Sequence, residues 1–120
     1  MSDPLSDVVR LLRPRAVFSK GISGAGTWSV RYTEFGEPSF CVVREGGCLL
    51  AVDGHAPVAL EAGDFVLLPA TPGFTLGSGD THLPTRIDPH AAAARTADIR
   101  HGRPDGPPDV RLLGGWFQFD

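Results

Sequence analysis

Short apolar runs separated by glycine, proline and aspartate make up most of this chain. Fifteen glycines and eleven prolines among such runs favour many turns and short strands over a helical bundle. The β-type runs are Ala16–Ile22, Thr27–Glu34, Ser39–Arg44, Cys48–Val52, Val58–Leu60, Phe65–Leu68, Phe74–Leu76 and Val110–Phe119. Asp53-Gly54 is the strongest hairpin signal, and Gly114-Gly115 predicts a bend or bulge. The sequence predicts a mostly β fold, a small antiparallel barrel or jelly roll without βαβ alternation.

A short helix is predicted before the first of these runs. Ser2 and Asp3 are N-cap candidates, and Pro4 suits the first helical turn. Apolar residues then recur at helical spacing, at Leu5, Val8, Val9 and Leu12. We expect a helix over about residues 3–13, whose apolar side either packs on the barrel or belongs to an interface.

The segment 77–108 differs from the rest in composition. It is rich in proline, glycine, aspartate and arginine, and it is longer than an ordinary connection within a compact domain. Asp88-Pro89 and the alanine-rich stretch after it predict a turn or two of helix over 90–97, and residues 100–108 have a flexible composition. We expect one domain over 1–120, with barrel strands over about 15–76 and 109–120. The long loop is either a mobile, responsive element or an inert insertion.

Charge and hydropathy exclude several classes of protein. The net charge is −3, and the arginines are scattered between Arg10 and Arg111, so no stripe that could read phosphates is visible. We expect no direct binding to nucleic acid. No signal-peptide pattern opens the chain, and no apolar run approaches the ~18 residues of a membrane span. The expected location is the cytoplasm, without membrane contact.

The two cysteines, Cys41 and Cys48, are too few for a disulfide scaffold. If Glu45-Gly46-Gly47 joins two antiparallel strands, Cys48 lies opposite about Arg44 and Cys41 lies on the other face. We expect free thiols, and we interpret Cys41 as a small buried hydrophobic residue rather than a ligand or sensor.

The histidines and serines indicate no catalytic or metal chemistry. His55 follows the Asp53-Gly54 turn, and the remaining histidines lie in the long segment, at His82, His90 and His101. Their spacing matches no metal motif, and no serine or cysteine has an identifiable base. We therefore expect no metal, no cofactor and no catalytic residue.

Five segments carry a resemblance to a known family. They are DPLSDVVRLLRP at the start, W-x-V-R at Trp28–Arg31, FCVVREGGCLLAVDG, LEAGDFVLLPATPGF and the closing RLLGGWFQFD. In this order and spacing the chain resembles the cupin-type N-terminal domain of AraC-family transcriptional regulators. The resemblance implies a double-stranded β-helix with a short N-terminal helix. It also implies a domain that receives a small-molecule or stress signal, dimerises and controls a DNA-binding region, which is expected to lie outside this chain.

The chain departs from the family pattern at the positions that carry chemistry. Cys41 and Phe74 stand where many relatives have metal-binding histidines, and Gly114 stands where some have a cysteine. A phenyl ring offers no lone pair to a metal, so the pocket would act through shape and apolar contact. We predict a ligand pocket lined by Trp28, Cys41, Phe74 and Trp116.

Three functions remain open at this stage. The leading hypothesis is a ligand-sensing and dimerisation domain of an AraC-type regulator, not an enzyme, whose partners are a small-molecule effector and a second copy of the chain. The first alternative is a free-standing metal-dependent cupin enzyme. The second is a filled barrel that serves only as a platform for dimerisation.

Overall fold

The computed structural model describes residues 4–13, 16–34, 36–70, 72–79, 85–87 and 98–118. The elements in chain order are α1 (Pro4–Leu12), β1 (Ala16–Ala25), β2 (Ser29–Tyr32), β3 (Ser39–Glu45), β4 (Gly47–Val52), β5 (Val58–Glu61), β6 (Phe65–Leu68), β7 (Phe74–Gly77), β8 (Thr85–Ile87), β9 (Ile99–Gly102) and β10 (Val110–Gln118). Each apolar run identified in the sequence contains a strand, and the predicted helix is α1.

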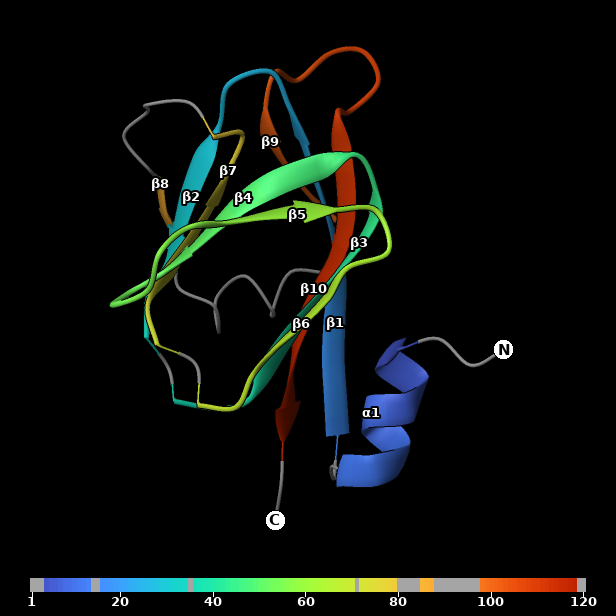
Figure 1. Cartoon of the computed structure of the whole chain (residues 1–120). Helices are drawn as coiled ribbons and strands as arrows, with labels where there is room; N and C mark the ends of the chain where they lie inside the picture. Colours follow the sequence, from blue (N-terminus) through green and yellow to red (C-terminus); the bar gives the residue numbers. More distant parts are fainter. Residues whose placement is uncertain are drawn as a thin grey trace.

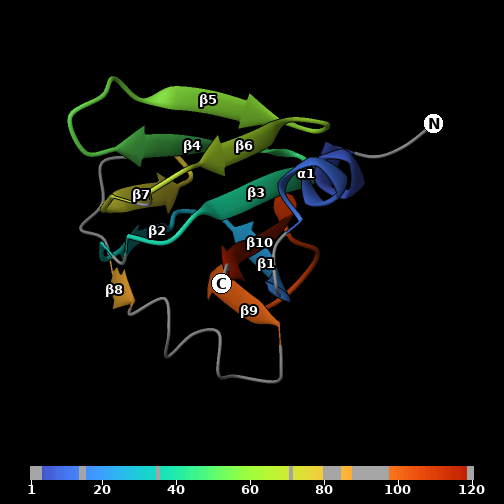
Figure 2. The same ribbon diagram turned by 90° about the horizontal axis from the view of Figure 1, so that it is seen from below.

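The strands form two five-stranded sheets that face each other (Figures 1 and 2). Sheet I has the order β6-β3-β10-β1-β9, and sheet II has the order β5-β4-β7-β2-β8. Pairing is antiparallel, except that β9 runs parallel to β1 and β8 runs parallel to β2. Between β1 and β7 the chain changes sheet at every connection apart from the β4–β5 hairpin. This is the predicted mostly β, cupin-like double-stranded β-helix with a short N-terminal helix.

The main core lies between the two sheets. Alternate residues of the strands point inward, as the pleat of a β-strand requires. The buried inward residues form one cluster of Trp28, Val30, Tyr32, Val43, Cys48, Leu50, Leu60, Leu76, Val110 and Leu112. Ile22, Cys41, Val52, Val66 and Phe74 pack against this cluster and are partly exposed. The interior is therefore apolar along most of its length.

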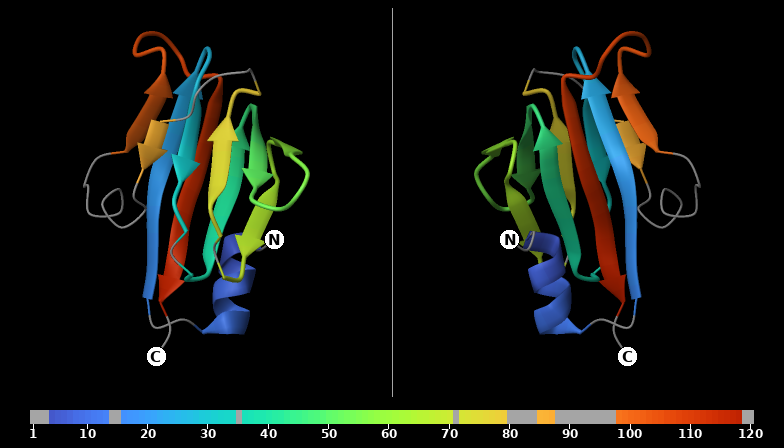
Figure 3. Two further views of the ribbon diagram at one scale, coloured as in Figure 1. Left: turned by 90° about the vertical axis from the view of Figure 1, so that its left-hand side faces the viewer. Right: turned by 90° about the vertical axis from the view of Figure 1, so that its right-hand side faces the viewer.

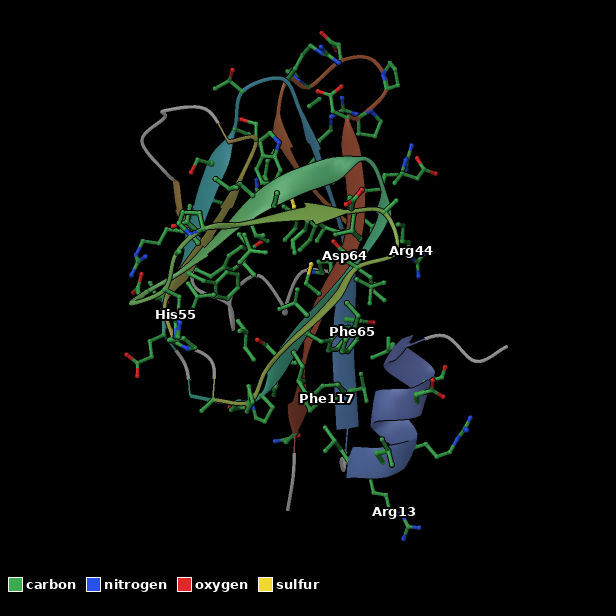
Figure 4. All side chains as sticks on the ribbon, viewed as in Figure 1. Arg13, Arg44, His55, Asp64, Phe65 and Phe117 are labelled. Atoms are coloured by element: carbon green, nitrogen blue, oxygen red, sulfur yellow. The ribbon has the colours of Figure 1, made fainter. Side chains whose placement is uncertain are left out.

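A second apolar layer lies on the outer face of sheet I. Phe40 packs against Phe117, with 5.0 Å between ring centroids, and against Phe65 at 6.4 Å. Figure 2 shows α1 beside β3 on this side, and Figure 4 shows Phe65 and Phe117 near the helix. Leu11 is 82% exposed, so α1 leaves part of its apolar surface uncovered. Within the described residues no helix is long and apolar enough to cross a membrane.

The prediction of a strand-free loop over 77–108 was wrong. The described part of that segment contains β8 and β9, which add a parallel strand at one edge of each sheet. The guanidinium groups of Arg100 and Arg103 donate hydrogen bonds to backbone carbonyls of residues 103–107, so the stretch expected to be flexible has internal ties. The predicted helix over 90–97 lies outside the described residues. Mobility of the segment stays a prediction.

Two local predictions were also wrong. Residues 45–47 do not join paired strands, because β3 lies in sheet I and β4 in sheet II. The chain crosses between the sheets at Gly46, whose positive φ of 71° is accessible to glycine at little cost. The bulge that Gly114-Gly115 suggested is absent, because β10 pairs regularly there and its register shift lies between Arg111 and Leu112 instead.

Candidate functional site

The structure separates the four residues predicted to line a pocket. Trp28 is 4% exposed and lies in the core, near the end of β10 that begins at Val110. Trp116 is half-buried toward the other end of β10, where it pairs with Ser39. Cys41 and Phe74 pack against the same core cluster. None of these four residues borders the groove described below.

Tyr32 lies next to both Cys41 and Phe74. Its ring stacks on Phe74, with 4.9 Å between centroids and 17° between planes. Burial raises the pKa of Tyr32 to about 12, and the nearby Cys41 adds to the shift. The hydroxyl oxygen is fully buried and has no hydrogen-bond partner among the described residues. Tyr32 is therefore a neutral hydrogen-bond donor held in apolar surroundings.

Both thiols lie in the interior and are free. Burial raises the pKa of Cys41 to about 12, with a further contribution from Cys48, and burial raises that of Cys48 to about 11. The thiolate is the form that attacks electrophiles and binds metals, and at neutral pH it is a minute fraction of either group. This supports the interpretation of Cys41 as a small hydrophobic residue.

The residues present do not fit a cupin metal centre. Of the two positions where the family resemblance implies histidines, Phe74 offers no lone pair, and Cys41 would be a single ligand where zinc normally takes at least three protein ligands. In the part of the chain that the structure describes, no group of three or more histidine, cysteine, aspartate or glutamate residues could hold a metal ion.

An apolar groove of about 480 Å³ opens between the free edges of the two sheets. Its lining consists of Leu50, Val52, His55, Ala56, Val58, Leu60, Val66, Leu68, Pro69, Ala70 and Pro72. The groove lies where β5, the edge of sheet II, diverges from β6, the edge of sheet I; Figure 3 shows both strands, in yellow-green, on one side of the molecule. His55 is the one lining residue that can carry a charge, and Figure 4 shows it at the tip of the β4–β5 hairpin.

Local sequence explains why the groove stays open. Gly63 and Asp64 turn the chain from β5 to β6, and the Asp64 carboxylate accepts a hydrogen bond of 2.8 Å from the Glu61 amide. The turn is held to sheet I because the amides of Gly63 and Val43 donate to the carbonyls of Val43 and Asp64, at 2.9 and 3.0 Å. β5 pairs only with β4 among the described strands, so the space between β5 and β6 is not closed by backbone pairing.

One layer of side chains separates this groove from Tyr32. Val66, in the groove wall, is the register partner of Cys41, and Val52 is the register partner of Phe74. Partners in an antiparallel pair point to the same face of the sheet, so Cys41 and Phe74 stand directly behind the two valines. Tyr32 contacts Phe74 and lies next to Cys41, one step further into the barrel.

An ion pair borders the loop that leads from β6 to β7. Arg31 donates two hydrogen bonds to the Asp53 carboxylate, at 3.0 Å from Nη1 and 2.6 Å from Nη2. The hydrogen bond with Arg31 lowers the pKa of Asp53, and the same bond raises the pKa of Arg31. Gly73 packs directly against the pair and accepts a bond of 3.0 Å from the Asp53 amide. The positive charge of Arg31 and the negative charge of Asp53 thus neutralise each other.

The opposite part of the barrel, around Trp28, is closed. The Trp28 ring stacks on His101 at 5.6 Å between centroids, and burial lowers the pKa of His101. A Cβ atom at Gly24 would overlap the Trp28 ring. The Asp109 carboxylate accepts a 2.7 Å hydrogen bond from the Gly26 amide. This bond joins the end of β1 to the start of β10 at this end of the barrel.

Sequence reasoning missed both Tyr32 and the groove. A signal for Tyr32 was present, because Trp28, Val30 and Tyr32 follow the alternation of a strand with one buried face. The groove combines residues from three strands and two loops, and its opening depends on the divergence of β5 from β6.

Comparison with known proteins supports the fold assignment. A family model described as Cupin matches residues 3–120 of the chain. Proteins of Streptomyces lividans and Streptomyces antibioticus, both named as AraC-like transcription regulators, are 39% and 40% identical to 98% of this chain. The chain spans 38% of the length of each of these relatives.

Similarity to a solved structure is weak. The EutQ protein of Clostridium difficile is 11% identical, with a TM-score of 0.38 over 89% of this chain and 52% of that chain, which is too low to bear on fold or function. The family model and the curated relatives agree with the two-sheet architecture and confirm the resemblance to the cupin domain of AraC-type regulators. The chain belongs to the cupin family.

Proposed function

We propose that this cupin domain is the ligand-sensing and dimerisation domain of an AraC-type transcription regulator, and that the groove between β5 and β6 binds its effector. The observation that carries the proposal is an apolar groove of about 480 Å³, a size typical of small-molecule sites. The two Streptomyces relatives, which match 98% of this chain, are named as AraC-like transcription regulators, and this supports the regulatory role.

The chemistry of the interior argues against an enzyme. Among the described residues, the thiols and the phenol of the core, Cys41, Cys48 and Tyr32, all have a raised pKa and stay protonated at neutral pH. Of the family's two histidine positions, Phe74 offers no lone pair to a metal, and Cys41 alone supplies too few ligands for a metal centre. What remains is recognition by shape and apolar contact, which suits a sensor.

Dimerisation forms the second part of the proposal. Leu11 and Leu12 on α1 are 82% and 41% exposed, and apolar residues on one exposed helix are common in interfaces. Sedimentation velocity on the purified chain tests this part: we expect a dimer that dissociates in Leu11→Ser. A chain that is monomeric at all concentrations would contradict it and leave the groove proposal unaffected.

Binding to the groove can be tested with α-methylstyrene, an uncharged hydrocarbon, in an amide NMR titration. We expect concentration-dependent shifts at Leu50, Val52 and Val66, with a Kd on the order of 0.1–1 mM for so small a probe. Leu68→Trp, whose indole fills the groove, should abolish these shifts, whereas Leu11→Ser on α1 should retain them. Absence of the shifts in the unmodified chain, or their persistence in Leu68→Trp, would contradict the proposal.

A further inference from the structure

The Tyr32 hydroxyl is a buried hydrogen-bonding group for which the described residues supply no partner. Tyr32 is 7% exposed, and its hydroxyl oxygen has no partner among the described residues. Most buried polar side-chain atoms in native proteins do have a partner, because an unsatisfied group loses its hydration without compensation. An unused donor at this depth therefore points to an acceptor that is supplied from outside the fold.

Tyr32 lies close to the positions of the family's metal ligands and to the groove wall. Its ring lies against Phe74 and its hydroxyl lies near Cys41, the two positions where a related metal site would have its ligands. The register partners of these residues, Val52 and Val66, belong to the groove wall. Cys41 and Phe74 stand between these valines and Tyr32, so a group that enters between the valines must also pass these two side chains to reach the phenol.

The charge of the surroundings restricts what that group can be. All described groove-lining residues other than His55 are apolar, and His55 is exposed at the rim. The guanidinium of Arg31 is already bound to Asp53 in two hydrogen bonds. An ionised ligand would have to lose its hydration here without gaining an opposite charge, so charged ligands are disfavoured. A neutral acceptor on an apolar body meets no such cost.

We propose that the groove binds an uncharged, mostly apolar carbonyl compound, a ketone or ester. Its carbonyl oxygen passes between Val52 and Val66, then past Cys41 and Phe74, and accepts a hydrogen bond from the Tyr32 hydroxyl. This inference rests on the proposed function of the groove. Apolar contact with the leucines and valines holds the body of the molecule, and Tyr32 distinguishes it from a hydrocarbon of the same shape.

Acetophenone and α-methylstyrene form a matched pair of probes, because they differ in a carbonyl oxygen against a methylene group at nearly the same shape. NMR titration of the purified chain should give a Kd for acetophenone about tenfold lower than for α-methylstyrene. In Tyr32→Phe the ratio should fall to about one, while the affinity for α-methylstyrene stays unchanged. Tyr32 is the one tyrosine of the chain, so this substitution removes the phenol without a second site.

Thermal unfolding of Tyr32→Phe at neutral pH gives a second, independent readout. Since the hydroxyl has no partner in the part of the chain that the structure describes, its removal should leave the Tm unchanged or raise it. A marked fall in Tm would show that the hydroxyl is already used by the fold, and would overturn the inference.

The outcomes separate the two proposals. Equal affinity for the two probes in the unmodified chain, or a preference for acetophenone that persists in Tyr32→Phe, overturns the role of Tyr32 and leaves the groove as a binding site. Absence of binding by both probes overturns the proposed function of the groove, and the inference with it.

Discussion

The two parts of the barrel differ in how their glycines are used. Around Trp28, glycines stand where no side chain fits: a Cβ at Gly24 would overlap the indole, and one at Gly102 would overlap the Ala25 carbonyl. Beside the groove, Gly54 has positive φ but no other atom within 4 Å of a Cβ placed there. The first region is closed by contact, whereas the second is shaped by turns around open space.

This difference indicates that the two parts of the barrel have different roles. Close-packed regions tolerate little change in volume and keep a fixed geometry. A groove between two unpaired sheet edges can admit a ligand without breaking backbone pairing, because β5 and β6 are not hydrogen-bonded to each other. The closed end thus supports the fold, and the open side is available for binding.

The largest effect is expected from glycine substitutions at the two regions. In Gly46→Ala the new Cβ would overlap the Asp109 carbonyl at a residue with φ of 71°, so we expect a loss of about 3 kcal/mol or more in the free energy of unfolding. Gly54→Ala has a similar φ but open space, and should cost only about 1 kcal/mol. Urea denaturation measures both. Equal losses would remove the contrast between the closed and open regions.

Matched valine truncations should give the next largest difference. Val43 is 1% exposed in the core, and Val43→Ala should lower the free energy of unfolding by about 2–3 kcal/mol. Val66 is half-buried and borders the groove, so Val66→Ala should cost about 1 kcal/mol. Chemical denaturation distinguishes the two variants, and a larger loss for Val66→Ala would mean that the groove is filled in solution.

Alkaline pH should reveal the buried phenol. The pKa of Tyr32 is near its ordinary value of 10.0 in the unfolded chain and about 12 in the folded protein. The contribution of this difference to the free energy of unfolding is therefore complete below about pH 10 and is lost as pH rises toward 12. Tyr32→Phe should flatten the stability profile there by up to about 1.4 kcal/mol per pH unit.

Cys41 and Cys48 remain in that variant and keep their own alkaline dependence, because their pKa values are also raised. Denaturation at a series of pH values tests the assignment. An unchanged slope between about pH 10 and 12 in Tyr32→Phe would place the phenol in a solvated environment.

The smallest effect is expected from the ion pair beside the groove. Arg31 holds the pKa of Asp53 below its ordinary value, so this stabilisation is present above that value and is lost as pH falls through the lower, folded-state pKa. Because Asp53 is half-exposed, Asp53→Asn should change stability little at neutral pH and weaken its decline in acid. Thermal unfolding at neutral and acidic pH measures this, and a large loss at neutral pH would contradict the solvent-screened character of the pair.

Most of the fold could be predicted from local sequence. The runs from Ala16 to Leu76 and the closing strand are each marked by apolar content and flanking turn residues, and the Asp53-Gly54 turn is the hairpin between β4 and β5. The strands β8 and β9 were missed because each pairs in parallel with a strand far away in sequence, and short runs in a segment rich in proline and glycine carry no local signal for such pairing.

The site was predicted less completely. Cys41 and Phe74 both lie next to Tyr32, whereas Trp28 and Trp116 lie toward different ends of β10, and a pocket lined by these four residues stays a prediction. Composition cannot assign a depth along the barrel axis to a tryptophan, because that depth is set by register between strands. The free thiols were expected, although for a reason that the crossing at Gly46 invalidates.

The central claim is that the open side of the barrel, rather than a metal centre, is the place where this domain binds a molecule. Crystals of the chain soaked with α-methylstyrene test it most directly. We predict electron density for the probe between β5 and β6, in contact with Val52 and Val66, and no metal ion between Cys41 and Phe74. A probe found only at other surfaces, or a metal ion held at Cys41, would contradict the account.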